Sequence, residues 1–357
     1  MGNRRFVTWA ARLALLLASL TICLVLVEVV ARLASEQPDW APPPAVPADL
    51  ADAKVYETVF QLLRRNAKGL HKGLPYRTNS VGMRGPEIEV KKPRGVFRIA
   101  VIGDSFTMGS GVLEHQAYPV VLEGLLAAEY EKPRFQVLNL GISGLNLHMS
   151  VGRLESVAHP FRPDLVVYGF TENDLRGRHY RKSTVEVSWR VEAPEAREAV
   201  FQAPRFLRSR FFSLLELIAP PEGSYVRELD DNYFNNPEAW KYFEDAMTQL
   251  ARYGEENDVC VMMLVHTDLH FLHFLHPMRR HYAAAEQAAK ERGIAVQQSF
   301  DYFRGRDAPS LWVSGHDFHP NPEGHEILAR ALLDGLEALP PECWPPPYSR
   351  RWPREDR

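Results

Sequence analysis

Short apolar runs that alternate with helical segments constrain the fold of this chain most strongly. Four runs rich in β-branched and other apolar residues lie at 97–102, 135–140, 165–168 and 259–265, and a weaker one lies at 294–297. Runs of this kind are typical of strands buried on both faces. Helical patterns lie between and after them, at 118–130, 147–158, 237–256, 278–292 and 322–339. The alternation predicts an α/β fold with a mostly parallel, five-stranded sheet and helices on both of its faces.

The composition is that of a globular protein and argues against nucleic-acid binding. Hydrophobic residues make up 45% of the 357 residues and charged residues 24%, which argues against disorder along most of the chain. A net charge of −3 leaves no excess positive field for a polyphosphate backbone, so we expect no nucleic-acid partner. The three cysteines, Cys23, Cys260 and Cys343, lack CxxC spacing. They allow at most one disulfide and predict no zinc knuckle.

The N-terminal region departs from this composition. Residues 13–27 carry no charge and lie between Arg12 and Glu28, and the apolar residues on either side extend them toward the length of a transmembrane helix. Arginines precede the segment, so the positive-inside rule predicts a single-pass protein of the inner (cytoplasmic) membrane, with a cytoplasmic N-terminus and a periplasmic or extracellular main domain. A cleaved signal peptide is the alternative, but cleavage after Ala34 would place Arg32 where a small residue is required.

Composition also divides the chain into segments. We expect a cytoplasmic N-terminus with a membrane anchor at 1–34, a Pro/Ala-rich linker at 35–53, a lead-in segment at 54–96, the main domain at 97–339 and a tail at 340–357. A charged segment at 175–236 interrupts the alternation of strands and helices and is predicted to be an insertion. Within it, residues 206–218 have amphipathic character, which suits a lid, a membrane-surface helix or a helix packed on its own domain.

The candidate reactive residues follow the predicted strands or precede the last predicted helix. Ser105, in Gly103-Asp104-Ser105, comes directly after the first strand of the core, and ligands of parallel sheets bind at the carboxyl ends of strands. A serine nucleophile requires a neighbouring base and a group that orients the base. His319 and Asp317 precede the last predicted helix and are the candidates for these two roles.

Two further strand ends offer donors for a developing oxyanion. Residues 139–144 close the second strand and contain Gly141 and Gly144, while residues 169–174 close the third strand and contain Asn173. Backbone N–H groups and a side-chain amide are the groups that stabilise an oxyanion. We expect all three strand ends to lie on one edge of the sheet.

These four blocks resemble the SGNH hydrolases, also called GDSL-type lipases and esterases. The resemblance covers about residues 97–339 and the lead-in 76–85, which is similar to that of membrane-anchored bacterial members. It implies a flavodoxin-like, three-layer α/β/α fold and a serine esterase with Ser105 as nucleophile and His319 as base. It also implies an oxyanion hole formed by the backbone of Ser105 and by Gly144 and Asn173, with Gly141 as the alternative to Gly144.

The last block departs from the family pattern. The family usually places the aspartate three residues before the histidine, whereas Asp317 lies two residues before His319 and His316 fills the third position. Spacing of the form Asp-x-His resembles that of polysaccharide O-acetylation enzymes. We therefore assign the orienting role to Asp317 in preference to Asp301 or Asp307.

Each of these residues also has a structural interpretation. Ser105 could cap the following helix, the two glycines could form a turn and Asn173 could satisfy a loop. This interpretation requires four separate coincidences, so we favour the catalytic one. We expect structural roles for Asp104, in the turn, and His325, on the final helix.

A histidine-rich stretch follows the fourth strand and invites comparison with a metal site. It contains His266, Asp268, His270, His273 and His276. Apolar residues alternate with these side chains, and serine hydrolysis needs no ion, so we expect neither a metal nor a cofactor. The nucleotide-binding motifs G-x-x-x-x-G-K-[ST] and strand-linked G-x-G-x-x-G are absent from the sequence.

The sequence thus predicts an esterase that hydrolyses O-acyl esters, and O-acetyl esters above all, on an extracytoplasmic glycan or lipid. Transfer of the acyl group to a sugar hydroxyl would make the protein an O-acetyltransferase of a cell-surface polysaccharide. A non-catalytic, glycan-binding envelope protein is the alternative from a different class.

Overall fold

A computed structural model describes residues 9, 12, 15–27, 29, 64–175, 225–270, 272, 276–315 and 317–344. The chain forms two units, of which one contains residues 40–191 and 228–357 and the other contains residues 1–39 and 192–227. Within the second of these, residues 15–27 are helical. No helix in the described part of the chain is both long enough and apolar enough to cross a membrane. Much of the expected anchor, the linker at 35–53 and most of the insertion lie outside the described residues.

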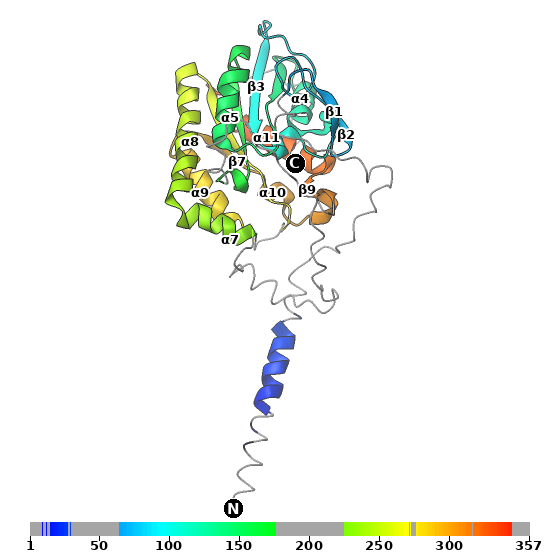
Figure 1. Cartoon of the computed structure of the whole chain (residues 1–357), viewed down its shortest axis with the longest axis vertical. Coiled ribbons are helices and arrows are strands. Elements are labelled where there is room, and N and C mark those ends of the chain that lie inside the picture. Colours follow the sequence, from blue (N-terminus) through cyan, green and yellow to red (C-terminus); the bar gives the residue numbers. More distant parts are fainter. Residues whose placement is uncertain are drawn as a thin grey trace, which may run out of the picture. The chain divides into compact units, whose positions relative to one another are not determined.

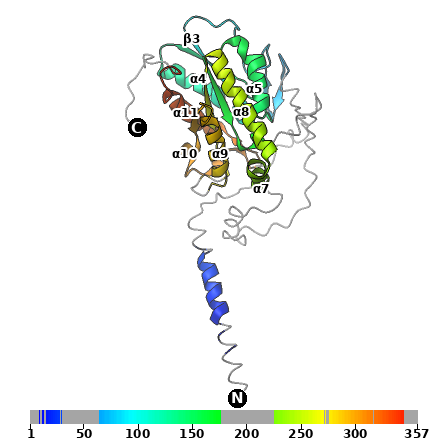
Figure 2. The same cartoon turned by 90° about the vertical axis from the view of Figure 1, so that its left-hand side faces the viewer.

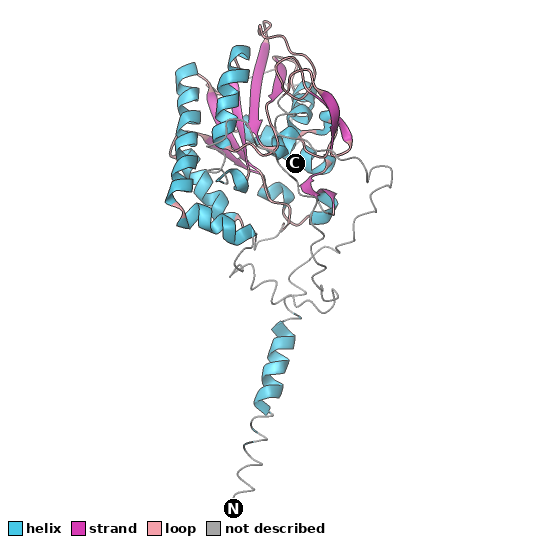
Figure 3. Ribbon diagram, viewed as in Figure 1, coloured by secondary structure: helices cyan, strands magenta, loops and turns pink. Residues whose placement is uncertain are grey.

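A five-stranded parallel sheet organises the larger unit (Figure 3). Its strands are β3 (Val96–Gly103), β4 (Arg134–Asn139), β5 (Leu165–Phe170), β6 (Cys260–Val265) and β7 (Ala295–Gln298), and their spatial order is β4-β3-β5-β6-β7. Every neighbouring pair is parallel. The predicted α/β class and all five predicted strands are confirmed, and β3 is buried along its whole length, as its continuous apolar run indicates.

Helices cover both faces of the sheet (Figures 1 and 2). The helices α4 (Tyr118–Glu129) and α11 (Pro322–Glu337) pack together on one face, while α5 (Leu147–Arg153), α8 (Pro237–Asn257) and α9 (Arg279–Lys290) lie on the other. Asparagine side chains begin three of these helices, where Asn146, Asn236 and Asn321 each accept a hydrogen bond from a backbone N–H of the first turn. The shorter helices are α3 (Ser105–Met108), α7 (Tyr225–Asp230) and α10 (Phe300–Phe303).

Two antiparallel hairpins flank the carboxyl edge of the sheet. The first pairs β1 (Lys68–His71) with β2 (Leu74–Arg77) and belongs to the lead-in segment. Its two turn residues, Lys72 and Gly73, have φ values of 50° and 77°, as a tight two-residue hairpin turn requires. The second pairs β8 (Trp312–Ser314) with β9 (Asp317–Pro320).

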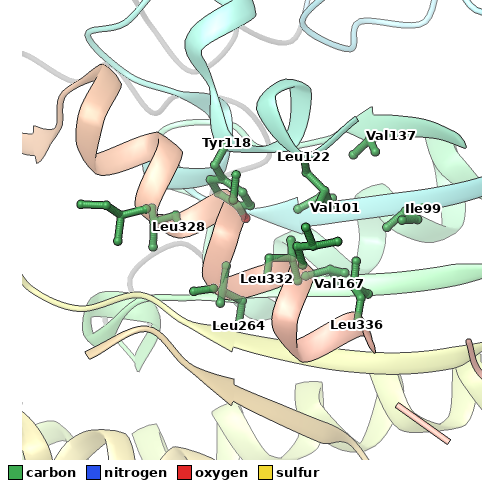
Figure 4. Close-up of a cluster of buried hydrophobic side chains, with 14 of the residues drawn as sticks. Ile99, Val101, Tyr118, Leu122, Val137, Val167, Leu264, Leu328, Leu332 and Leu336 are labelled. Atoms are coloured by element: carbon green, nitrogen blue, oxygen red, sulfur yellow. The ribbon is translucent and has the colours of Figure 1, made fainter. Parts of the chain in front are cut away.

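The main hydrophobic core fills the space between the sheet and the α4–α11 face (Figure 4). Alternate residues of β3, Ile99 and Val101, point into it, as the period of two along a strand dictates. Leu328, Leu332 and Leu336 present one stripe of α11 to the same core, since residues four apart share a helix face. The core therefore fixes α11, which directly follows the strand that carries His319.

One disulfide joins Cys260, at the start of β6, to Cys343, which follows α11, with their Cα atoms 5.4 Å apart. The bond lies within the limit of one bridge set by the cysteine count, and the sequence did not indicate which two cysteines form it. Among the described cysteines, Cys23 is free.

Replacing Leu332 by alanine tests how much this core contributes to the free energy of unfolding. Leu332 is completely buried, so Leu332→Ala is expected to lower the free energy of unfolding by about 2–5 kcal/mol through lost burial and a residual cavity. Arg330→Ala on the exposed side of the same helix removes only a surface pair with Glu326 and should cost less than about 1 kcal/mol. Denaturant unfolding of both variants checks the difference; equal losses would contradict this description of the core.

Candidate active site

Ser105 lies at the point where the order of strands reverses. The strand before it, β3, pairs with β4 on one side and with β5 on the other, and such switch points are where doubly wound sheets bind their ligands. Ser105 is the first residue of α3, and Asp104 caps that helix by accepting a hydrogen bond from the Phe106 N–H at 2.9 Å. The expected turn role of Asp104 is thus observed, and the cap of the helix is Asp104 rather than Ser105.

A continuous chain of hydrogen bonds links the three residues assigned to the triad. His319 Nε2 lies 2.8 Å from Ser105 Oγ, and His319 Nδ1 lies 2.5 Å from Asp317 Oδ1. An ionised carboxylate can only accept, so Nδ1 carries the proton that it donates to Asp317. Nε2 is then free to accept the hydroxyl proton of Ser105, which is the arrangement that activates a serine nucleophile.

The strand β9 explains why Asp-x-His spacing suffices in this chain. Side chains two residues apart in an extended strand point to the same side, and Asp317 and His319 occupy the first and third positions of β9. Phe318, between them, is exposed at 38%. The departure from the three-residue spacing of the family therefore matches a strand in place of a turn.

Asp317 is held in its ionised form. Burial alone would raise the pKa of its carboxyl group, but the hydrogen bond and charge interaction with His319 and the ammonium of Lys72 outweigh burial. The net effect lowers the pKa of Asp317 well below its usual range. The carboxylate is thus available as an acceptor throughout the neutral pH range.

The candidate oxyanion donors lie on the loops that follow β4 and β5. Asn173 is partly buried, and its Oδ1 lies 3.2 Å from the hydroxyl of Thr171, which itself donates to Asp104 Oδ2 at 3.0 Å. Asn173 is therefore linked to the residue next to Ser105. Gly144 is exposed and has a φ of 80°, and no hydrogen bond within the described residues ties it to the triad.

Gly141 has a packing role that distinguishes it from Gly144. A Cβ atom at Gly141 would lie 2.3 Å from the backbone nitrogen of Met108 and 2.6 Å from the carbonyl carbon of Thr107. The loop after β4 thus rests directly against the backbone of α3. This contact assigns Gly141 to the support of the nucleophile helix and leaves Gly144 as the candidate donor.

Two buried, neutral histidines lie near Ser105. His266 is completely buried and stacks on Phe106, with ring centroids 5.3 Å apart. His325, on α11, accepts a hydrogen bond from the Tyr118 N–H at 3.3 Å, which agrees with the structural role expected for it. Burial lowers the pKa of each histidine to about 3, so both are uncharged at neutral pH.

The remaining members of the histidine-rich stretch bond to Asp268. His270 Nδ1 lies 2.9 Å from both carboxylate oxygens of Asp268, and His276 Nε2 lies 2.9 Å from its backbone oxygen. His273 lies outside the described residues. Among the side chains that the structure describes, no group of three or more is arranged to hold a metal ion.

Lys72 was not predicted by the sequence analysis. Its Nζ donates to Asp317 Oδ2 at 2.6 Å and lies 3.2 Å from His319 Nδ1. The only sequence signal at this position is a Lys-Gly turn between two short strand-like segments. No local pattern indicates that this turn meets residues that are more than 240 positions away.

The comparison with protein families agrees with this geometry. The family described as GDSL-like Lipase/Acylhydrolase matches residues 101–327, well over half of the chain. The chain therefore belongs to this family, and it is a serine ester hydrolase. The family resemblance inferred from the four sequence blocks is confirmed.

Solved structures of low sequence identity that are similar to the chain include the following three. A putative lipolytic protein of the G-D-S-L family from Desulfitobacterium hafniense DCB-2 is 13% identical, with 67% of this chain and 98% of that chain covered and a TM-score of 0.41. The acetylxylan esterase Axe2 from Geobacillus stearothermophilus is 18% identical, with 67% of this chain and 93% of that chain covered and a TM-score of 0.42. TesA is 15% identical, with 67% of this chain and 98% of that chain covered and a TM-score of 0.40. A search of curated proteins gave no match.

Adding a methyl group at Gly141 tests the support of the nucleophile helix. Gly141→Ala forces the first turn of α3 away from its position, which is expected to lower stability by about 1–3 kcal/mol and to lower kcat about 100-fold through displacement of Ser105. Gly124→Ala is the matched control, because a Cβ there meets nothing within 4 Å and its helical position favours alanine by about 0.5–1 kcal/mol. Steady-state kinetics and thermal unfolding measure both effects, and unchanged kcat in Gly141→Ala would refute the packing argument.

Proposed function

We propose that this esterase is anchored in the inner membrane by its N-terminal segment and removes O-acyl groups, above all O-acetyl groups, from an extracytoplasmic glycan or lipid. The observation that carries the catalytic part is the hydrogen-bonded chain from Ser105 Oγ through His319 to Asp317. Together with the family match, this series of hydrogen bonds favours an enzyme over a non-catalytic, glycan-binding protein.

The geometry suits acyl transfer in two halves. Ser105 Oγ attacks the ester carbonyl while His319 Nε2 takes the hydroxyl proton, and Asp317 stabilises the imidazolium that forms. The backbone N–H of Ser105, the N–H of Gly144 and the side-chain amide of Asn173 are the proposed donors to the oxyanion. His319 then gives the proton to the departing alcohol. A water molecule, activated by the same histidine, hydrolyses the acyl-serine and releases the acid.

One feature supports a small acyl group on a sugar. The Asp-x-His spacing resembles that of polysaccharide O-acetylation enzymes. Phe318, between the two residues, faces the other side of β9, where its ring lies edge-on to Trp312 with ring centroids 4.8 Å apart.

The disulfide supports an extracytoplasmic location. Disulfides persist in oxidising compartments and are rare in the cytosol, and Cys260 and Cys343 are joined across 83 positions of sequence. The arginines that precede residues 13–27 are consistent with the same orientation. Both features point to a main domain on the outer side of the membrane.

Covalent labelling tests the nucleophile. A small fluorophosphonate is expected to add once to the wild-type protein, and Ser105→Ala should lose the adduct and lower the hydrolysis of p-nitrophenyl acetate by roughly 10⁴-fold or more while remaining folded. Ser143→Ala is the matched control, because Ser143 lies at the same edge of the sheet and bonds only weakly to Met108 Sδ, at 3.8 Å. It should keep the adduct. Intact-mass spectrometry detects the adduct in each variant. An adduct that persists in Ser105→Ala would exclude the mechanism.

The fate of the acyl-serine distinguishes hydrolysis from transfer. With p-nitrophenyl acetate as donor and a deacetylated oligosaccharide added, a hydrolase releases acetate at the rate of nitrophenol release and leaves the oligosaccharide unmodified. Mass spectrometry of the oligosaccharide measures the partition. Acetylated oligosaccharide in excess over free acetate would identify an O-acetyltransferase and overturn the hydrolytic assignment.

A further inference from the structure

The carboxylate of Asp317 has a separate donor for each of its two oxygens. Oδ1 accepts from His319 Nδ1 at 2.5 Å, and Oδ2 accepts from the ammonium of Lys72 at 2.6 Å. Hydrogen bonds between charged partners are short and about twice as strong as neutral ones. Two contacts, one on each oxygen, thus fix the rotation of the Asp317 carboxylate about its Cβ–Cγ bond.

The hairpin that carries Lys72 is attached to the domain. His71, the residue before Lys72, bonds through Nε2 to Ser110 Oγ at 2.9 Å, on the loop after α3. Tyr76, on the second strand of the hairpin, is buried and packs in a small core with Met108 of α3. Lys72 therefore reaches Asp317 from a support that also contacts the nucleophile helix.

Asp317 needs this second contact because of its position. It begins a strand of four residues in a two-stranded hairpin, and its side chain keeps 20% of its surface exposed. A carboxylate at such a site can turn toward water at little cost. One more hydrogen bond on Oδ2 removes that freedom.

We propose that Lys72 is a positioning residue of the triad, whose ammonium holds the Asp317 carboxylate in the orientation that directs Oδ1 at His319. The inference rests on the proposed function, in which the triad is catalytic.

Lys72 also acts on His319 through its charge. Its Nζ lies 3.2 Å from Nδ1, which already donates to Asp317, so this contact is a repulsion between two donors whenever the lysine is charged. Asp104 at the end of β3 and His325 on α11 interact electrostatically with His319 as well, and they are unchanged when Lys72 is replaced.

Lys72→Met tests this role, with Lys68→Met as control on the same hairpin. We expect kcat for p-nitrophenyl acetate to fall about tenfold, within the range of coupling between neighbours in one network, with little change in KM. A loss confined to kcat is a result that general disruption of the hairpin would not give. Lys72→Arg should recover most of kcat, and thermal unfolding should confirm that every variant is folded.

A double-mutant cycle shows whether Lys72 acts through Asp317. In the Asp317→Asn background, Lys72→Met should change kcat less than twofold. An equal effect in both backgrounds, or an unchanged kcat in the Lys72→Met single variant, would overturn the proposal while leaving the triad intact. Full activity in Asp317→Asn itself would instead show that the proposed triad is wrong.

Discussion

The close approach of α3 to the ends of three strands is the constraint on which the active site depends. Thr107, on the buried side of α3, occupies space that Cβ atoms at Gly103, Gly141 and Gly169 would otherwise enter. These glycines follow or belong to β3, β4 and β5. Any larger residue at these points would push the nucleophile helix off the sheet. The hydroxyl of Thr107 lies 2.9 Å from that of Tyr118, so a hydrogen bond also fixes the Thr107 side chain in this position.

Burial shifts the pKa values of the ionisable groups around the triad toward the neutral form. Burial raises the pKa of Asp104 and raises that of Asp174 well above its usual range, while burial lowers the pKa of His266 and His325 to about 3. Removing charged groups from water is costly. The Asp317–Lys72 pair differs from these groups, because two opposite charges lie 2.6 Å apart and stabilise each other.

Much of this arrangement could be predicted from the sequence. Continuous apolar runs located all five strands, because a strand buried on both faces has few polar positions. Ser105 was found because ligands of parallel sheets bind where strands end, and His319 was found with Asp317 in the block before the last predicted helix. The family match over residues 101–327 places the same blocks in one domain. The extended conformation of β9 was not predicted, since its strand pairing depends on a partner strand and not on the order of residues alone.

The contacts missed by the sequence analysis join segments that are distant in the chain. Lys72 contacts Asp317 only because the lead-in hairpin packs beside α3. The spacing of apolar residues along the sequence does not predict such a contact. The histidine-rich stretch shows the opposite case, in which close spacing suggests one site. Strand geometry and the bonds to Asp268 separate those side chains into a buried His266 and a group at the edge of the sheet.

The bond between Cys260 and Cys343 closes a covalent ring of chain that contains both Asp317 and His319. Ser105 and the strands β3, β4 and β5 lie outside that ring. A protease that cut one peptide bond within the ring would leave the fragments joined, and His319 would stay tethered beside Ser105. Once the disulfide is reduced, the same cut releases the C-terminal piece. The tolerance of the enzyme to a nick in this region is therefore set by the redox state of its surroundings.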